Sequence, residues 1–381
     1  MSAHLRLGLA CLLATVILWG SGCIGSDTLR PHQGVDFDRL FAPPTDAEIA
    51  QVLQEWSARS RGDTYDPEDI AVEYDDDFFG DGSRLVILSH TVGGAPFTHY
   101  GAVRFPPGQP PEGGWPVVVY HHGGSNGLDL SKQLDRFVTG PLTAVGSRSV
   151  IVAPTYRSEP LFNTPIGDLV SGGELDPWDR DVDDAIALLN ATLETFPDLL
   201  ETRGFATLGA SRGGAVSLLM AIRDERAQSA AVYFGPTDFF SPVVRQIAES
   251  YLADEPLEGF VIGRGATYLL EEVLTALSEG EISHDMARLE LLKRSAARLA
   301  AFLPSTVAHH HECDPSVPFE QFEALERMAT AIDGASEFYG YDVGCPDGAL
   351  NGRFHSMKER VMPGNGERTA EFLTRSARRQ R

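Results

Sequence analysis

Short, largely apolar stretches alternate with amphipathic stretches along the central and C-terminal parts of the chain. A strand that is apolar throughout suits a sheet covered on both faces, whereas a half-exposed strand alternates apolar and polar residues. Alternation of such strands with helices is typical of parallel strands joined by crossover helices. We therefore expect an α/β fold with a mostly parallel central sheet and helices on both faces. The predicted strands are residues 116–120, 150–153, 205–208, 230–234, 306–309 and 337–341.

One crossover helix is visible in the spacing of its apolar residues. Its buried face is expected to carry Val182, Ala185, Ile186 and Leu189. Several aspartates lie at or near its first turn, where the helix dipole favours carboxylates. We interpret them as helix-starting rather than catalytic. They are Asp179, Asp181, Asp183 and Asp184.

The region before the first parallel strand has a different pattern. Residues 46–59 are expected to form a helix within an N-terminal extension. Residues 70–75, 84–90 and 100–105 are expected to form antiparallel opening strands, because acidic and glycine-rich turns separate them. No internal repeat of the kind that announces a propeller or a solenoid is visible.

The first residues are typical of an export signal. Arg6 precedes a 13-residue apolar stretch, residues 7–19, which is too short to cross a bilayer comfortably. Small residues and then Cys23 follow, an arrangement that resembles bacterial lipoprotein signals, whose cysteine is lipidated. Gly20 departs from that pattern, which prefers leucine there, so plain secretion is the alternative. We expect residues 1–22 to be a signal peptide and the protein to be exported. The exported protein is then either anchored by lipid in the bacterial cell envelope, at the outer membrane, or released into the periplasm or the medium.

Charge and composition narrow the classes of partner. The formal net charge is −23 and the sequence pI is about 4.8, which argues against a nucleic-acid partner, since that would require clustered lysine and arginine. With 43% apolar residues, the 381-residue chain can bury one large core or two modest ones.

Export also changes the interpretation of the cysteines. Cys11 leaves with the signal and Cys23 carries the lipid, so Cys313 and Cys345 remain as a pair in an oxidising compartment. A disulfide between them closes a loop of about 32 residues and contributes about 3–4 kcal/mol on the chain-entropy model. The alternative is two unpaired buried thiols.

The motif Gly209-Ala210-Ser211-Arg212-Gly213 carries the chemistry. It follows the predicted strand 205–208 and precedes a helix of small residues. A sharp strand-to-helix turn makes a serine hydroxyl project to where a base can reach it, and flanking glycines are needed because a Cβ would collide with the neighbouring elements. Ser211 is therefore the candidate nucleophile.

A nucleophilic serine also needs donors for the negative charge that develops on the substrate. His122, Gly123 and Gly124 leave the end of strand 116–120, from which a backbone N–H can reach the oxyanion, and the amide of Arg212 would supply a second. A metal pair formed by His121 and His122 is the alternative, but adjacent side chains of a strand point to opposite faces.

The orienting acid and the base are expected after the serine. Asp314 follows the strand at 306–309, and His355 lies after the last strand and before the final helix. In the working mechanism His355 takes the Ser211 proton while Asp314 fixes the imidazole tautomer. Asp238, which also follows a strand, is the competing acid, and Glu312 is a weaker one.

The run of histidines at His309, His310 and His311 suggests a metal site, but strand alternation places only two of them on one face. We therefore expect neither a metal nor another cofactor.

Five stretches together resemble the prolyl oligopeptidase (S9-type) and dienelactone hydrolase branch of the α/β-hydrolases, over residues 85–375. They are Val117-Val118-Val119-Tyr120-His121-His122-Gly123-Gly124, Val152-Ala153-Pro154-Thr155-Tyr156-Arg157, Asp181-Val182-Asp183-Asp184-Ala185, Gly209-Ala210-Ser211-Arg212-Gly213-Gly214 and Asp314-Pro315-Ser316-Val317-Pro318. The resemblance implies an α/β-hydrolase fold in which Ser211, Asp314 and His355 match the catalytic positions, and residues 122–124 match the oxyanion strand end.

The chain departs from this family in two respects. Peptidases of the family usually carry a propeller or a comparable access-restricting domain, whereas about 60 residues precede the opening strands here, which puts a peptidase role in doubt. His311-Glu312 stands where relatives usually have His-Gly, and the larger side chain is expected to reshape the wall beside Asp314.

Residues 239–304 are expected to form a mostly helical insertion that caps the candidate site, within a catalytic domain of residues 70–381 preceded by the extension of residues 23–69. Tyr156, Arg157 and Trp178 are candidate pocket residues.

The sequence therefore predicts an exported serine hydrolase that cleaves carboxylic esters through an acyl-enzyme. Its substrate is expected to be a small-molecule ester or a short peptide. Peptidase or amidase activity is the nearest alternative, a non-catalytic surface binding protein is the alternative from another class, and a metal-dependent hydrolase is a weaker third.

Overall fold

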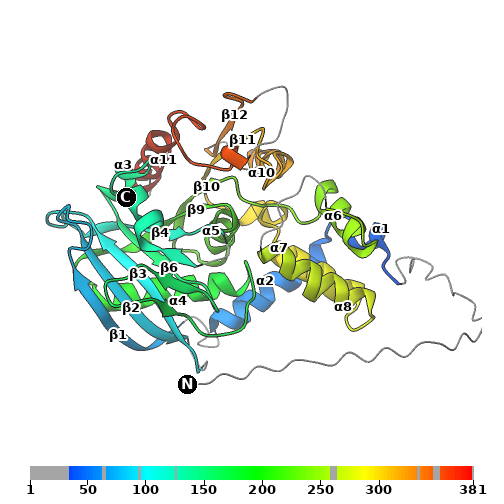
Figure 1. Ribbon diagram of the computed structural model, residues 1–381, viewed down its shortest axis with the longest axis horizontal. Helices are drawn as coiled ribbons and strands as arrows, with labels where there is room; N and C mark the ends of the chain where they lie inside the picture. The colour runs from blue at the N-terminus through cyan, green and yellow to red at the C-terminus, as the bar shows by residue number, and fades with distance from the viewer. Residues whose placement is uncertain are drawn as a thin grey trace, which may run out of the picture. The chain divides into compact units, whose positions relative to one another are not determined.

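A nine-stranded sheet runs through the described part of the chain (Figure 1). The structure is a computed structural model that describes residues 34–61, 66–92, 96–124, 127–257, 264–332, 335–345 and 352–379. The predicted signal peptide and Cys23 lie outside the described residues.

The strand order explains how the sheet is built. It is β1-β2-β3-β6-β4-β9-β10-β11-β12. The pairs β1–β2, β2–β3 and β3–β6 are antiparallel, and every later pair, from β6–β4 to β11–β12, is parallel. The bounds are β1 Pro67–Asp76, β2 Arg84–Val92, β3 Thr98–Phe105, β4 Trp115–His121, β6 Val150–Pro154, β9 Leu200–Ala210, β10 Ala227–Tyr233, β11 Thr306–His311 and β12 Glu337–Tyr341. The predicted mostly parallel sheet with antiparallel opening strands is confirmed.

Helices cover both faces of this sheet. Val86 and Leu88 of β2 pack into one core and Leu85 and Ile87 into the other, because successive side chains of a strand point to opposite faces. The first core is completed by α4 (Arg180–Thr195), α5 (Arg212–Arg223) and α10 (Glu320–Thr330), and the second by α3 (Thr143–Gly146) and α11 (Asn365–Arg379). The prediction of helices on both faces is confirmed.

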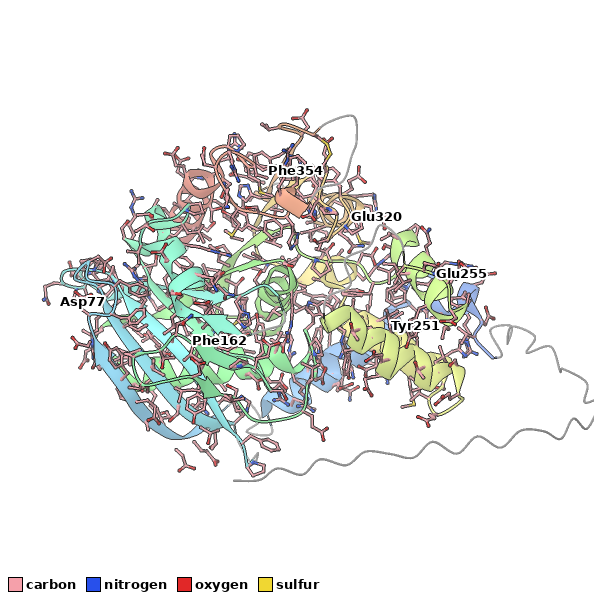
Figure 2. All side chains as sticks on the ribbon, viewed as in Figure 1. Asp77, Phe162, Tyr251, Glu255, Glu320 and Phe354 are labelled. Atoms are coloured by element: carbon pink, nitrogen blue, oxygen red, sulfur yellow. A yellow bond between two sulfur atoms is a disulfide. The ribbon has the colours of Figure 1, made fainter. Side chains whose placement is uncertain are left out.

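The segment between β10 and β11 is helical. Its elements are α6 (Pro242–Leu252), α7 (Arg264–Tyr268), η3 (Leu269–Leu274), α8 (Thr275–Ser278), α9 (His284–Lys293) and η4 (Ala296–Phe302). The amide of Val243 in α6 donates to the Glu320 carboxylate at the start of α10. In Figure 2, Tyr251 and Glu255 mark this insertion, Glu320 marks the start of α10 and Phe354 marks the segment that precedes His355.

The N-terminal extension packs on the same insertion. Helices α1 (Phe37–Leu40) and α2 (Asp46–Arg61) contact α9. The guanidinium of Arg288 in α9 donates to the backbone carbonyls of Arg39, Leu40 and Ala42 and to the carboxylate of Glu48. These hydrogen bonds connect the extension to the insertion.

The remaining elements are short. A second sheet in the described structure joins β5 (Leu128–Asp129), β7 (Pro160–Phe162) and β8 (Leu169–Val170). Three short helical elements complete the described structure, η1 (Leu130–Leu134), η2 (Asp135–Phe137) and η5 (Gly352–Phe354). Within the described residues, no helix has the length and apolar character needed to cross a membrane.

Candidate active site

Ser211 occupies the sharp turn between β9 and α5. Its φ of +56° lies in the left-handed region, and its amide donates to the carbonyl of Tyr233 at 2.9 Å. A Cβ added to Gly209 would lie 1.9 Å from the Gly213 carbonyl oxygen, and one added to Gly213 would lie 2.1 Å from that of His121. Because only glycine fits at both places, the turn can close tightly and hold Ser211 at the carboxyl edge of the sheet in a strained conformation.

Ser211, His355 and Asp314 lie in one chain of hydrogen bonds. The Ser211 hydroxyl lies 2.9 Å from Nε2 of His355, and Nδ1 of His355 lies 2.7 Å from Oδ2 of Asp314. The other carboxylate oxygen of Asp314 accepts from the amides of Ser316 and Val317. The loop after β11 and the turn at η5 thus bring together the three residues that the sequence proposed.

Of the two alternative acids, Asp238 is paired with an arginine and Glu312 is exposed. Asp238 accepts from the guanidinium of Arg298 at 2.9 and 2.8 Å. Glu312 is exposed to solvent. Asp314, which is buried, is the carboxylate that His355 contacts.

The loop after β4 passes directly beside the serine. A Cβ at Gly123 would lie 2.7 Å from the carbonyl oxygen of Ala210 and 3.0 Å from Cβ of Ser211. Gly124 follows with a φ of +82°. Arg212 begins α5, and an amide in the first turn of a helix has no partner inside that helix. The segment after β4 and the first turn of α5 therefore both lie beside Ser211.

The side chain of Arg212 points away from this position into a buried cluster of charges. It donates from Nε and Nη2 to Asp181 at 3.0 and 2.8 Å and from Nη1 to Glu159. It also lies 4.5 Å from the ring centroid of Tyr156. Although burial disfavours its charge, the two carboxylates raise the pKa of Arg212 above its usual value. The cluster fixes the residue that follows Ser211.

Sequence reasoning missed Glu159 and interpreted Asp181 as part of a helix start. Asp181 is buried, and its neighbours on α4 are also paired with arginines, Asp183 with Arg223 and Asp184 with Arg157. A signal was present, because Arg212 directly precedes the small and apolar residues of α5, and a buried arginine must find a carboxylate.

Two of the three expected pocket residues do not line the cavity beside Ser211. Tyr156 is fully buried beside the end of β4, where its ring stacks on His122 at 4.3 Å and its hydroxyl donates to the His122 carbonyl. Arg157 turns toward α4 to pair with Asp184 at 2.7 Å. The expectation for these two residues was wrong, because Tyr156 packs against His122 and Arg157 pairs with Asp184.

The side chain of His122 is buried next to Glu159. Burial lowers its pKa to about 4, and its Nε2 lies 3.7 Å from a carboxylate oxygen of Glu159. The imidazole is therefore neutral at neutral pH and packs beneath the loop that contains Gly123.

A cavity of about 1070 Å³ opens beside Ser211 and His355. Trp178 lines it. The backbone of Trp178 has a φ of +68°, and its ring packs 4.9 Å from that of Phe239. Helix α6 of the insertion contributes Val243, Val244 and Ile247 to the wall.

The histidines at the end of β11 have protein partners. His309 is hydrogen-bonded to the hydroxyls of Tyr341 and Thr369, and His310 to the carbonyl of Val317. His311 contacts the carbonyl of Val343 and accepts from the amide of Cys313. Among the residues that the structure describes, no group of three or more histidine, cysteine or acidic side chains is arranged to hold a metal ion.

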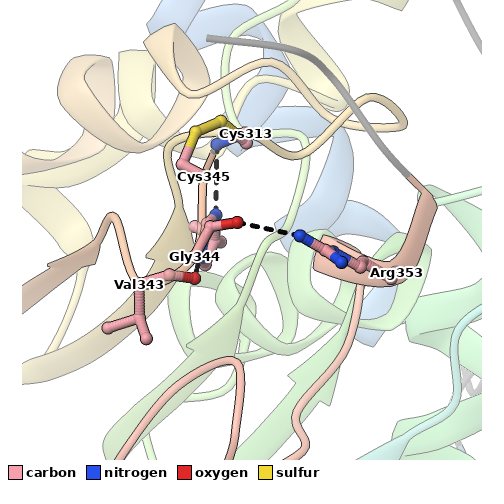
Figure 3. The surroundings of a disulfide bond; sticks show 6 residues. Cys313, Val343, Gly344, Cys345 and Arg353 are labelled. Carbon is pink, nitrogen blue, oxygen red and sulfur yellow. Dashed lines mark hydrogen bonds between the residues drawn. A yellow bond between two sulfur atoms is a disulfide. The ribbon is translucent and has the colours of Figure 1, made fainter. Parts of the chain in front are cut away.

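A disulfide lies beside the Asp314 loop. Cys313 and Cys345 are joined, with their Cα atoms 6.0 Å apart (Figure 3). Figure 3 also shows Arg353 turned toward Gly344, whose carbonyl accepts a hydrogen bond from its guanidinium at 2.8 Å. The disulfide and this hydrogen bond connect the segment that precedes His355 to the one that carries Asp314.

The fold was assigned by comparison with solved structures. No protein-family model and no curated protein matches the sequence. Among solved structures, acetyl xylan esterase 1 from a Thermoanaerobacterium species is similar, with 16% identity, a TM-score of 0.58, and coverage of 90% of this chain and 99% of that one. The rice cell wall degrading esterase LipA from Xanthomonas oryzae has 13% identity, a TM-score of 0.51 and coverage of 82% and 99%. A putative dipeptidyl aminopeptidase IV from Bacteroides ovatus has 13% identity and a TM-score of 0.51, with coverage of 77% of this chain and 36% of that one. The chain has the α/β-hydrolase fold.

Proposed function

We propose that this protein is a serine hydrolase that cleaves carboxylic esters. The observation that carries the proposal is the chain of hydrogen bonds from Ser211 through His355 to Asp314, at 2.9 and 2.7 Å, at the wall of a large cavity. A nucleophile, a base and an orienting acid in this arrangement are what acyl transfer requires.

The geometry supports a two-step mechanism. His355 takes the hydroxyl proton as Ser211 Oγ attacks the ester carbonyl, and Asp314 stabilises the imidazolium. The amides of Arg212 and of Gly123 or Gly124 bind the oxyanion, each donor contributing about 3 kcal/mol to transition-state stabilisation. His355 then protonates the leaving alcohol. Water activated by the same imidazole hydrolyses the acyl-enzyme and releases the carboxylic acid.

The cavity favours an ester substrate with an apolar acyl group. Phe239 and the α6 residues Val244 and Ile247 provide an apolar wall. The esterases among the structural neighbours support the same choice, whereas the dipeptidyl aminopeptidase-like neighbour keeps S9-type peptidase activity as the second candidate.

We also propose that the protein is exported and lipid-anchored through Cys23. The disulfide between Cys313 and Cys345 supports an oxidising compartment, because disulfides persist mainly outside the cytoplasm. Metabolic labelling with an alkyne fatty acid tests the anchor. If Cys23 is lipidated, the wild type is labelled and Cys23→Ser is not. An unlabelled wild type recovered outside the cell would favour plain secretion.

The activity is tested with p-nitrophenyl esters of increasing acyl length beside aminoacyl anilides, using the purified wild type, Ser211→Ala and His355→Ala. Ester hydrolysis that disappears in both variants supports the proposal. Preferential anilide cleavage would favour the peptidase. A folded wild type that cleaves nothing in either panel would favour a binding role.

A further inference from the structure

The cavity beside Ser211 has two chemically different walls. The apolar wall comes from the helical insertion and the residues packed on it, including Trp178, Phe239 and Ile247. The polar wall comes from η1, η2 and the segment after His355. Its cationic residues are Lys132, Arg136 and Lys358. Helix α3, against which η2 packs, and helix α6 lie well apart on either side of α5 (Figure 1), so the two walls are separated.

Arg136 is a cation of the polar wall whose side-chain hydrogen bonds go to neutral groups. This partly buried guanidinium donates from Nη1 to the hydroxyl of Tyr120 at 3.0 Å and to Sδ of Met357 at 3.5 Å, and both partners are neutral. Within the described residues it forms no ion pair, in contrast to Arg157 with Asp184 and Arg294 with Asp176. In a protein with a net charge of −23, the cavity beside Ser211 therefore contains a guanidinium that has no carboxylate partner among the described residues.

The polar wall carries more positive than negative charge, since Lys132, Arg136 and Lys358 face one carboxylate, Asp135, among its described residues. Lys132 pairs with Asp129 at 2.7 Å, and Asp135 accepts a hydrogen bond from the hydroxyl of Thr139. Lys358 forms no ion pair in the described structure and adds a second cation on the segment that follows His355. The polar wall thus offers donors and positive charge to an anion.

Arg136 lies next to the segment that follows His355, the proposed base. His355 must deliver its proton to the leaving oxygen, so the leaving group lies on the His355 side of Ser211. Arg136 contacts Met357, two residues after His355, and Lys358 follows directly. A group carried on the alcohol part of the substrate therefore reaches the cationic wall, while the acyl part extends along the apolar wall.

We propose that the substrate is an ester of an apolar carboxylic acid whose alcohol part carries an anionic group, which Arg136 and Lys358 bind. The inference rests on the proposed esterase function and specifies its substrate class. Arginine is suited to this role because its planar fork matches a carboxylate or a phosphate with two parallel hydrogen bonds.

The test compares two probes that differ in one charge: the hexanoyl ester of 4-hydroxybenzoate and that of 4-hydroxybenzamide. The wild type is expected to hydrolyse the anionic ester with the higher kcat/KM. Arg136→Gln is expected to lower the anionic-to-neutral ratio of kcat/KM by about tenfold, as loss of a charge-assisted hydrogen bond predicts. Arg136→Lys is expected to restore part of the preference, and added salt to reduce it in the wild type.

Using the ratio within each variant cancels any effect that Arg136→Gln has on the position of His355 through Met357. Arg203→Gln, at an exposed position outside the cavity wall, is the matched control and is expected to keep the wild-type ratio. Equal hydrolysis of both esters by the wild type, or an unchanged ratio in Arg136→Gln, would overturn the inference while leaving the esterase function intact. A wild type that hydrolyses neither ester would overturn the proposed function and the inference together.

Discussion

Arg212 and Asp181 form a two-point ion pair directly behind Ser211. Nε of the guanidinium donates to one carboxylate oxygen at 3.0 Å and Nη2 to the other at 2.8 Å, and both side chains are buried. Since the amide of Arg212 is the proposed oxyanion donor, the pair holds that amide in place from the side-chain end. Preorganised donors contribute more than mobile ones because they need no reorganisation as the reaction proceeds.

Arg212→Lys is therefore expected to lower kcat on the order of tenfold, with a small change in KM, because lysine keeps the charge but cannot make the two-point contact. Steady-state kinetics on a p-nitrophenyl ester, with thermal unfolding to verify the fold, measure this. Arg226→Lys is a matched control, because Arg226 pairs with Asp224 away from the cavity. Equal kcat in Arg212→Lys and the wild type would show that the pair has no positioning role.

Asp314→Asn is expected to reduce kcat by about 10⁴-fold, because an amide holds the imidazole in the wrong tautomer. Asp238→Asn removes the negative charge that pairs with Arg298 and is expected to lower the unfolding temperature while activity is retained. The pair of variants separates the two aspartates. Loss of activity in Asp238→Asn with retention in Asp314→Asn would reverse the assignment.

Breaking the disulfide is expected to lower the free energy of unfolding by about 3–4 kcal/mol, since it closes a loop with a sequence separation of 32 residues. Urea unfolding of the wild type with and without reductant measures the change. The Cys313→Ala, Cys345→Ala double variant provides the control, as reductant should leave its unfolding curve unchanged. A reductant-insensitive wild type would show that the bond is not formed.

Stability is expected to fall on mild acidification because buried histidines are held neutral. Burial lowers the pKa of His309 to about 3, and burial likewise lowers the pKa values of His121 and His310. Below an unfolded-state pKa of about 6.5 the unfolded chain binds protons that the folded chain excludes, so stability is fully present above that pH and is lost toward the folded-state pKa. Each such histidine costs about 2 kcal/mol at pH 5.

Unfolding temperatures at pH 7 and pH 5 test this. The wild type should be less stable at pH 5, and His309→Gln, which removes one such group, should show a smaller difference between the two values. Identical pH differences in the two proteins would contradict this assignment to His309.

The fold was largely predictable because burial on both faces leaves a direct mark on the sequence. The strand predicted at 337–341 coincides with β12. Strand β9 begins at Leu200 rather than at 205, and its start was missed because residues 201–203 are polar and partly or fully exposed. The second sheet was not predicted, since strands of two or three residues such as β5 and β7 are too short to show a period.

The residues of the candidate site could be predicted only where the sequence carries a local pattern or a fixed order. The turn around Ser211 has a local pattern, and the order of acid and histidine located Asp314 and His355. The partners of Arg212 could not be located in this way, because Glu159 and Asp181 approach it from separate segments. The direction of the loop after β6, which buries Tyr156, likewise depends on tertiary packing and not on a local pattern.

The most direct test of the central claim is covalent labelling of the purified protein with a fluorophosphonate probe, followed by peptide mapping. The probe reacts with a serine only when a base activates it. The account predicts stoichiometric modification at Ser211 and its loss in Ser211→Ala and His355→Ala. An unlabelled folded wild type, or labelling at another residue that persists in Ser211→Ala, would contradict it.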